Sequence, residues 1–131
     1  MRRTALLLAI LLAVGCTSAP AASTAEGGVL EITVVAGPVC PVQTEEPDPE
    51  CDPRPVANAR VFVQPGDGRD ILVAEGATDD EGRVRIDLPV GDYIVTGGEV
   101  EGLFGLPEAV TVTVTGIEPA MATLTYDTGI R

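Results

Sequence analysis

The chain has 131 residues, with 20 Asp and Glu against 8 Arg and no Lys, His or Trp, so its formal net charge is −12. A surface that binds nucleic acid needs clustered basic residues, so this charge excludes nucleic acid as an expected partner. Hydrolytic triads are excluded because His is absent and the only serines, Ser18 and Ser23, both lie near the N-terminus. The composition therefore favours a protein that is not an enzyme.

The first fifteen residues have the features of an export signal. Arg2 and Arg3 precede an uncharged apolar run of ten residues, from Ala5 to Val14. A helix needs about 20 residues to cross a bilayer, so this run is too short to span and fits the hydrophobic region of a signal peptide. We therefore expect residues 1–15 to be removed on export.

The residues that lead to Cys16 resemble the lipobox of bacterial lipoproteins. They are Leu12, Ala13, Val14 and Gly15, with Ala13 at a position where the family usually has Leu. The resemblance implies cleavage after Gly15, lipid attachment at Cys16 and anchoring to the extracytoplasmic face of the cell membrane. The alternative is an ordinary secretory signal in which Cys16 is incidental.

Residues 16–27 are small and polar without apolar periodicity, so we expect a flexible tether between the lipidated cysteine and the folded domain. From Cys16 to Gly27 the chain can reach at most about 38 Å. Loss of Arg2 and Arg3 would leave six arginines against twenty acidic residues, a charge of −14. A domain with this charge is expected to be repelled by an anionic membrane surface.

Residues 28–131 show the period-two alternation of apolar and polar residues that is typical of β-strands, and no helical window. The clearest case places Val110, Val112 and Val114 on one face with threonines on the other. We expect an all-β, antiparallel Ig-like or prealbumin-like sandwich of about seven strands. The strands are predicted around residues 30–34, 59–63, 71–78, 83–88, 93–95, 110–115 and 122–126.

Cys40 and Cys51 are expected to form a disulfide. Export would place them in an oxidising compartment, and lipidation of Cys16 would leave only these two to pair. Their proline-rich flanks cannot be central strands, so the bond should close an irregular loop between the first and second strands. Closing this loop would stabilise the fold by roughly 3 kcal/mol. A redox-active pair is the alternative, but it would need a CxxC-like spacing and a basic environment.

The segment from Thr78 to Val95 resembles the signature hairpin of carboxypeptidase regulatory-like domains. It contains a Thr-Asp turn, an alternating strand and the residues Gly82, Leu88, Pro89, Gly91 and Tyr93. Asp79 can accept a hydrogen bond from the backbone amide two residues on, and Tyr93 can bury its ring while its hydroxyl reaches a backbone partner. Residues 55–61 resemble the family's segment before its second strand, so the likeness covers roughly residues 29–126. It implies a prealbumin-like sandwich and says little about function.

Five acidic side chains lie in the loop that the disulfide would close or directly after it, namely Glu45, Glu46, Asp48, Glu50 and Asp52. Ca²⁺ takes six or more oxygen ligands, so these residues are weak candidates for a calcium site. The alternative is a solvated acidic loop, which Pro47 and Pro49 favour because they hold the chain extended. No other metal, cofactor or catalytic residue is predicted.

Leu103, Phe104, Leu106 and Pro107 lie in a Gly-rich segment that is more apolar than a solvated loop requires. They are expected either to cap one end of the sandwich or to form an exposed tip for a partner. The sequence thus predicts a membrane-anchored, non-catalytic envelope module that contacts an unidentified protein or polymer through loops at one end of the sandwich. The alternatives are a calcium-stabilised surface domain and an enzyme with two carboxylates about 5 to 10 Å apart.

Overall fold

The computed structural model describes residues 27–41 and 45–130, so the predicted signal peptide and Cys16 lie outside the described residues. The described chain contains one short 3₁₀ helix, η1 (Pro49–Cys51), and eight strands. None of the helices within residues 27–41 and 45–130 has the length and hydropathy to cross a membrane. The strands are β1 (Gly27–Gly37), β2 (Arg54–Pro55), β3 (Arg60–Pro65), β4 (Ala74–Ala77), β5 (Arg83–Pro89), β6 (Gly91–Gly97), β7 (Val110–Val114) and β8 (Ala120–Asp127).

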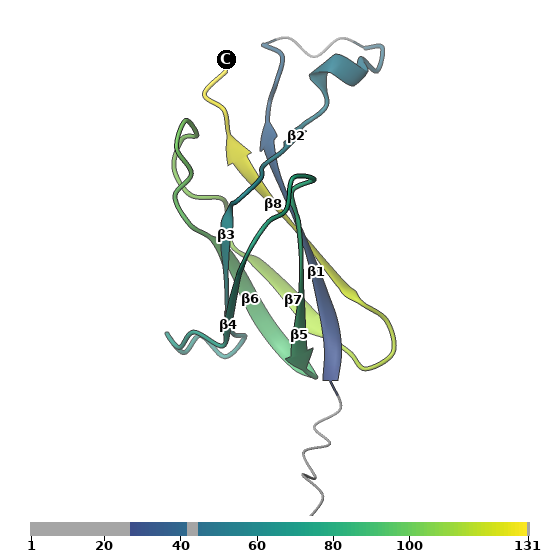
Figure 1. Cartoon of the computed structure of the whole chain (residues 1–131), viewed down its shortest axis with the longest axis vertical. Coiled ribbons are helices and arrows are strands. Elements are labelled where there is room, and N and C mark those ends of the chain that lie inside the picture. The colour runs from purple at the N-terminus through teal and green to yellow at the C-terminus, as the bar shows by residue number, and fades with distance from the viewer. Residues whose placement is uncertain (1–26, 42–44, 131) are drawn as a thin grey trace, which may run out of the picture.

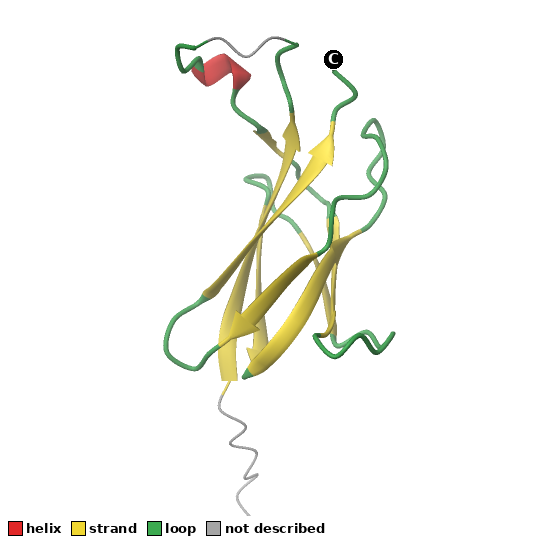
Figure 2. Ribbon diagram, turned by 180° about the vertical axis from the view of Figure 1, so that it is seen from behind, coloured by secondary structure: helices red, strands yellow, loops and turns green. Residues whose placement is uncertain are grey.

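The strands form two four-stranded sheets that pack face to face (Figures 1 and 2). In the first sheet β1 is central, with β5 and β2 paired antiparallel to it and β8 paired parallel to it. The second sheet has the order β4-β3-β6-β7 and is antiparallel throughout. The predicted all-β sandwich is confirmed, with eight strands instead of seven because the two-residue β2 adds to β1.

One strand pair departs from the antiparallel arrangement that the sequence predicts, because β8 runs parallel to β1. Their register pairs Leu30 with Ala120 and Val34 with Leu124. The loop after β7 crosses to the first sheet, and β8 then starts at the end of the sandwich where β1 starts (Figure 1). Side chains alternate in the same way in parallel and antiparallel strands, so the sequence pattern carries no information on strand direction.

The core lies between the sheets and consists mainly of aliphatic side chains at alternating strand positions, as the alternation predicted. On β1 the side chains of Leu30, Ile32 and Val34 are almost completely buried. Val84 and Ile86 of β5 pack against the core but are only half-buried. The other buried apolar residues are Ala36, Val56, Ala59, Val61, Val63, Leu88, Tyr93, Val95, Val112, Val114, Ala122, Leu124 and Tyr126.

The turn before β5 forms as its residues predict. The Asp79 carboxylate accepts hydrogen bonds from the backbone N–H of Glu81 and of Arg83, both at 2.9 Å. Gly82 has a φ of 74°, a conformation that favours glycine, and a side chain there would meet the Val34 carbonyl oxygen. The local chemistry of the Thr-Asp turn therefore fixes where β5 begins.

The strand predicted over residues 71–78 is wrong at its start, because β4 begins only at Ala74. Ile71, Leu72 and Val73 belong to the preceding loop and are exposed. The backbone N–H of Ile71 donates to the Arg69 carbonyl at 2.9 Å, which forms a tight turn. Residues 71–73 therefore have the composition of a strand but lie in a loop at one end of the sandwich, outside the sheet.

Candidate functional site

The sandwich has two ends that carry different loops (Figure 1). The tether end is the end where β1 begins, and it carries loop 66–73, the turn at Val90 and loop 115–119. The distal end is the opposite one, and it carries the loop between β1 and β2, loop 98–109 and the C-terminal segment 128–130. Loops at the end of a rigid sandwich are the usual place for binding side chains.

The predicted disulfide between Cys40 and Cys51 is confirmed and lies at the distal end, with the two Cα atoms 5.2 Å apart. It closes the loop between β1 and β2, which includes η1. Asp48 begins this short helix, and its carboxylate accepts the backbone N–H of Glu50 at 3.0 Å. The described residues from Pro41 to Glu50 are exposed, so the loop adds little to the core. We therefore take about 3 kcal/mol as an upper limit for the contribution of the disulfide to the free energy of unfolding.

The acidic residues of this loop do not converge on a common point within the described chain. Residues 27–41 and 45–130 hold no group of three or more Asp, Glu, Cys or His side chains that could hold a metal ion. The five candidates, Glu45, Glu46, Asp48, Glu50 and Asp52, are all exposed at the surface. Calcium binding by this loop stays a prediction without geometric support.

We expect millimolar Ca²⁺ to leave the Tm of the protein unchanged to within about 1 °C, because a ligand that does not bind the folded state cannot stabilise it. Differential scanning calorimetry with CaCl₂, compared with an equal ionic strength of NaCl, measures this. A rise of several degrees that is lost in a variant with Asp48→Asn and Glu50→Gln would establish a calcium site and contradict the expectation.

The apolar segment after β6 both caps one end of the sandwich and forms an exposed tip. Pro107 is buried and Leu103 is half-buried against the core, whereas Phe104 and Leu106 are exposed. The backbone N–H of Phe104 donates to the carbonyl of Asp127 at 2.9 Å, an isolated antiparallel bridge to the end of β8. The inward residues therefore cap the end of the sandwich while the outward ones form a tip at a fixed position.

A glycine holds the position of the Phe104 ring. Gly129 has a φ of 76°, and a Cβ atom at this position would overlap the ring of Phe104. The hydroxyl of the neighbouring Thr128 donates to the carbonyl of Pro38, so the C-terminal segment is also joined to the end of β1. The ring of Phe104 therefore lies against the C-terminal segment, which is itself joined to the end of β1.

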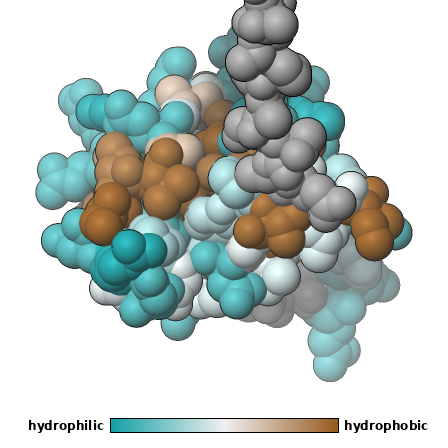
Figure 3. Space-filling view, turned by 90° about the horizontal axis from the view of Figure 1, so that it is seen from below, coloured by the Kyte–Doolittle hydropathy of each residue, from teal (hydrophilic) through white to brown (hydrophobic). Residues whose placement is uncertain are grey.

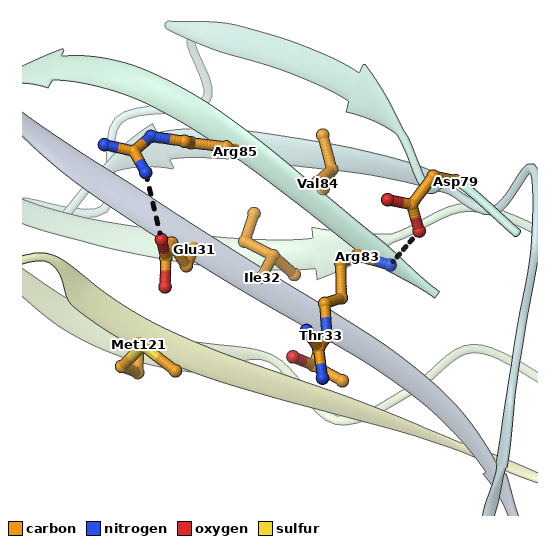
Figure 4. Close-up of a pocket in the computed structure, with 8 residues that line it drawn as sticks. All are labelled: Glu31, Ile32, Thr33, Asp79, Arg83, Val84, Arg85 and Met121. Atoms are coloured by element: carbon orange, nitrogen blue, oxygen red, sulfur yellow. Dashed lines mark hydrogen bonds and ion pairs between the residues drawn. The ribbon is translucent and has the colours of Figure 1, made fainter. Parts of the chain in front are cut away.

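A shallow hollow lies on the outer face of the first sheet, with a volume of about 350 Å³ (Figure 4). Its charged groups contact one another: the Arg85 guanidinium donates to the Glu31 carboxylate at 3.2 Å, and Asp79 accepts the backbone N–H of Arg83. Exposed ion pairs of this kind contribute about 0 to 1 kcal/mol, so they are weak structural contacts. The carboxylates of Glu31 and Asp79 are engaged in these contacts and do not present a free acid and base to a substrate.

The groups with raised pKa values are the two tyrosines, and both serve the fold. Burial raises the pKa of Tyr93, whose hydroxyl donates to the carbonyl of Pro89 at 2.6 Å. This is the backbone partner that the sequence predicts for Tyr93. Burial also raises the pKa of Tyr126, whose hydroxyl donates to the carbonyl of Gly98. The Tyr93 hydroxyl joins β6 to the last residue of β5, and the Tyr126 hydroxyl joins β8 to the loop after β6.

Sequence reasoning identified the disulfide and the Phe104 tip but missed two groupings. It did not bring Glu31, Arg85 and Met121 together, although all three line the same hollow from β1, β5 and β8. It also did not bring Ile71 and Ile117 to the same end of the sandwich. Alternation assigns each side chain to a face, but only the order of the strands decides which side chains become neighbours.

Comparisons with known proteins support the fold and leave the family open. No protein-family model matches the chain. No curated protein sequence matches it either. The resemblance to carboxypeptidase regulatory-like domains therefore rests on residues 55–61 and on the hairpin of residues 78–95 alone.

Solved structures with a similar fold include two bacterial proteins. The minor pilin GBS52 of the gram-positive pathogen Streptococcus agalactiae aligns with a TM-score of 0.57 and 19% identity, over 77% of this chain and 44% of the pilin chain. The Bacillus anthracis TIE protein aligns with a TM-score of 0.50 and 20% identity, over 77% of this chain and 16% of its own. This chain therefore spans less than half of either protein, and at these identities the likeness establishes the sandwich fold.

Proposed function

We propose that this protein is a bacterial envelope lipoprotein, anchored by Cys16 to the extracytoplasmic face of the membrane, whose sandwich binds a partner through its distal-end loops without catalysis. The observation that carries the proposal is that the start of β1 and the candidate binding loops lie at opposite ends of the sandwich. β1 begins at the tether end, whereas the disulfide loop and the exposed Phe104 and Leu106 lie at the distal end (Figure 1). A chain anchored ahead of β1 presents these side chains away from the membrane.

Two findings support a location outside the cytoplasm. Disulfides persist in oxidising compartments, and the Cys40–Cys51 bond is of the structural kind, because it closes an exposed loop of a small domain. The fold that this chain shares with a minor pilin is also consistent with a place in the bacterial envelope. Lipid attachment itself rests on the lipobox-like residues before Cys16.

A binding role is favoured over catalysis by the state of the polar groups. Across the described residues, the tyrosine hydroxyls with raised pKa values are bonded to backbone carbonyls, and the carboxylates of the outer hollow are held by neighbouring donors. Groups that carry out acid–base chemistry need access to a substrate. The hairpin of residues 78–95, which resembles carboxypeptidase regulatory-like domains, supports the same conclusion because it consists of residues that build the fold.

The distal end has the features of a small recognition surface. Phe104 and Leu106 are 65% and 63% exposed on a loop that is fixed by its contacts with β8. Exposed aromatic residues of this kind contribute most to binding when they enter a pocket on the partner. Glu99 and Glu101 line a hollow together with Leu106, and the disulfide loop at the same end carries further exposed acidic side chains. The partner is therefore expected to offer an apolar pocket with a neutral or basic rim.

The test is site-specific photo-crosslinking in the host cell, with a photoreactive residue at position 104 or, as control, at position 121 on the exposed sheet face. We expect position 104 to capture an envelope component and position 121 to capture none. Leu106→Asp should weaken the capture roughly 30-fold, because a charge in an apolar contact costs about 2 kcal/mol or more. Equal capture at both positions, or capture that Leu106→Asp leaves intact, would refute the assignment of the distal end.

A further inference from the structure

The tether end carries five exposed apolar side chains on three loops. We call them the tether-end patch: Ile71 is 50% exposed, Leu72 52%, Val73 41%, Val90 48% and Ile117 92%. Figure 3 looks onto this end and shows hydrophobic side chains at several places on its surface, with hydrophilic and intermediate ones between them. Solvated turns do not require such residues. Single exposed apolar residues are common, but several at one end of a domain indicate a surface that contacts a partner.

The three loops that carry the patch are held together by β1 and by one another. Gly27, at the start of β1, pairs with Pro89, the residue before Val90. The backbone at Gly28 lies so close to Thr115, at the start of the third loop, that a Cβ atom would overlap its carbonyl oxygen. The N–H of Gly66, at the start of loop 66–73, donates to the carbonyl of Asp92 at 2.7 Å. The patch and the start of β1 therefore belong to the same end of one rigid sandwich.

The loop that contributes three of the five residues is organised by its own polar groups. The Asp67 carboxylate accepts the backbone N–H of Arg69 at 3.1 Å and pairs with its guanidinium at 2.6 Å. The hydrogen bond from the Arg69 backbone is the main cause that lowers the pKa of Asp67. The N–H of Val73 donates to the carbonyl of Val63 at 2.8 Å. These contacts fix the backbone of the loop, and the side chains of Ile71 and Leu72 are about half exposed.

The charges around the patch restrict what it can contact. Asp67 is paired with Arg69, whereas Asp70, Asp92 and Glu118 leave this end with a net negative charge. An anionic polymer or a strongly anionic lipid surface is therefore a poor partner. Apolar side chains on a weakly acidic end fit an apolar layer beneath neutral or zwitterionic headgroups, which these charges do not repel.

We propose that the tether-end patch rests on the lipid bilayer that holds the Cys16 anchor, with Ile117, Ile71 and Leu72 inserted among the headgroups. This inference rests on the proposed lipid attachment. Cys16 lies eleven residues before Gly27, so the start of β1, at the same end as the patch, cannot be farther than about 38 Å from the anchored residue. Confinement near the surface makes the second contact intramolecular, so a patch too weak to bind membranes alone is sufficient to orient the domain. The distal end then points away from the membrane.

The test uses the absence of tryptophan from the chain. Ile117→Trp places a single reporter in the patch, and Phe104→Trp places a matched reporter at the distal end. Each lipidated full-length variant is purified from host membranes and reconstituted into phosphatidylcholine vesicles whose acyl chains are brominated. Bromine quenches only indoles that enter the bilayer, so we expect emission at position 117 to fall to about half and emission at position 104 to stay unchanged.

A third variant shows whether the patch or the new indole makes the contact. In the Ile117→Trp background, Ile71→Asp with Leu72→Asp should restore most of the emission, because two charges oppose insertion of the neighbouring loop. Intact mass of every sample reports the lipid on Cys16. If the lipid is present and Trp at position 117 is not quenched, the patch does not contact the bilayer. If it is quenched regardless of the two aspartates, the new indole makes the contact by itself, and the proposed role of Ile71 and Leu72 is refuted. If the mass shows no lipid, the proposed function fails instead, and this inference fails with it.

Discussion

If Cys16 carries the proposed lipid, Cys16→Ala should abolish acylation of the protein, and this is the largest effect expected of any single substitution. The thiol of Cys16 is the attachment point that the lipobox-like residues imply, and Ala offers no atom to acylate. Intact mass of wild-type protein from host membranes should correspond to residues 16–131 plus acyl chains, lowered by two hydrogens for the Cys40–Cys51 disulfide. The variant should carry no acyl mass and should either retain residues 1–15 or be cleaved at another position.

The matched control is the double substitution Cys40→Ala with Cys51→Ala, which removes the other two cysteines. It should keep the full acyl mass, because the disulfide lies in the folded domain at the distal end. Wild-type protein recovered without lipid from the culture medium would overturn the anchor. A freely diffusing secreted binder would then replace the envelope lipoprotein as the leading interpretation.

Leu124→Ala should destabilise the domain by about 3 kcal/mol, because the residue is fully buried between the sheets and truncation leaves a cavity. For a domain of about 100 residues this corresponds to a fall in Tm of about 12 to 24 °C. Thermal unfolding followed by circular dichroism measures the change. The substitution also tests the parallel register of β8 against β1, in which Leu124 lies beside Val34.

Thr123→Ala is the control for this register. Thr123 is exposed on the outer face of β8, so its truncation should change stability by no more than about 0.5 kcal/mol. A register shifted by one residue would reverse which of the two side chains faces the core. A larger loss for Thr123→Ala than for Leu124→Ala would therefore contradict the arrangement of β8 described here.

Most of the fold follows from local chemistry that a sequence displays directly. The alternation over Val110–Val114 and Arg83–Pro89 marks both strands correctly, because half-buried strands repeat every two residues. Asp79 and Gly82 mark the turn between strands, because few residues satisfy its backbone. The disulfide was predictable because the predicted export and lipidation of Cys16 would leave two cysteines to pair.

The errors arose where composition and tertiary context disagree. The run Ile71-Leu72-Val73 has the residues of a strand, yet the turn within its loop and the short length of β4 leave it outside the ladder. Propensity for strands reflects packing on a half-buried surface, and these residues have none to pack on. Their exposure is the observation that motivates a membrane-facing patch.

The amino-acid sequence by itself determined the acidic charge, the lipobox-like residues at Cys16, the all-β class, the disulfide and the local turn at Asp79, because each depends on residue types within a short segment. The tertiary structure alone decided that β8 runs parallel to β1, that Phe104 is supported by Gly129, and that Ile71 and Ile117 share the end where β1 begins. These depend on which strands become neighbours and in which direction they run. That choice is made by the packing of the whole core, and no alternating pattern within a single strand contains it.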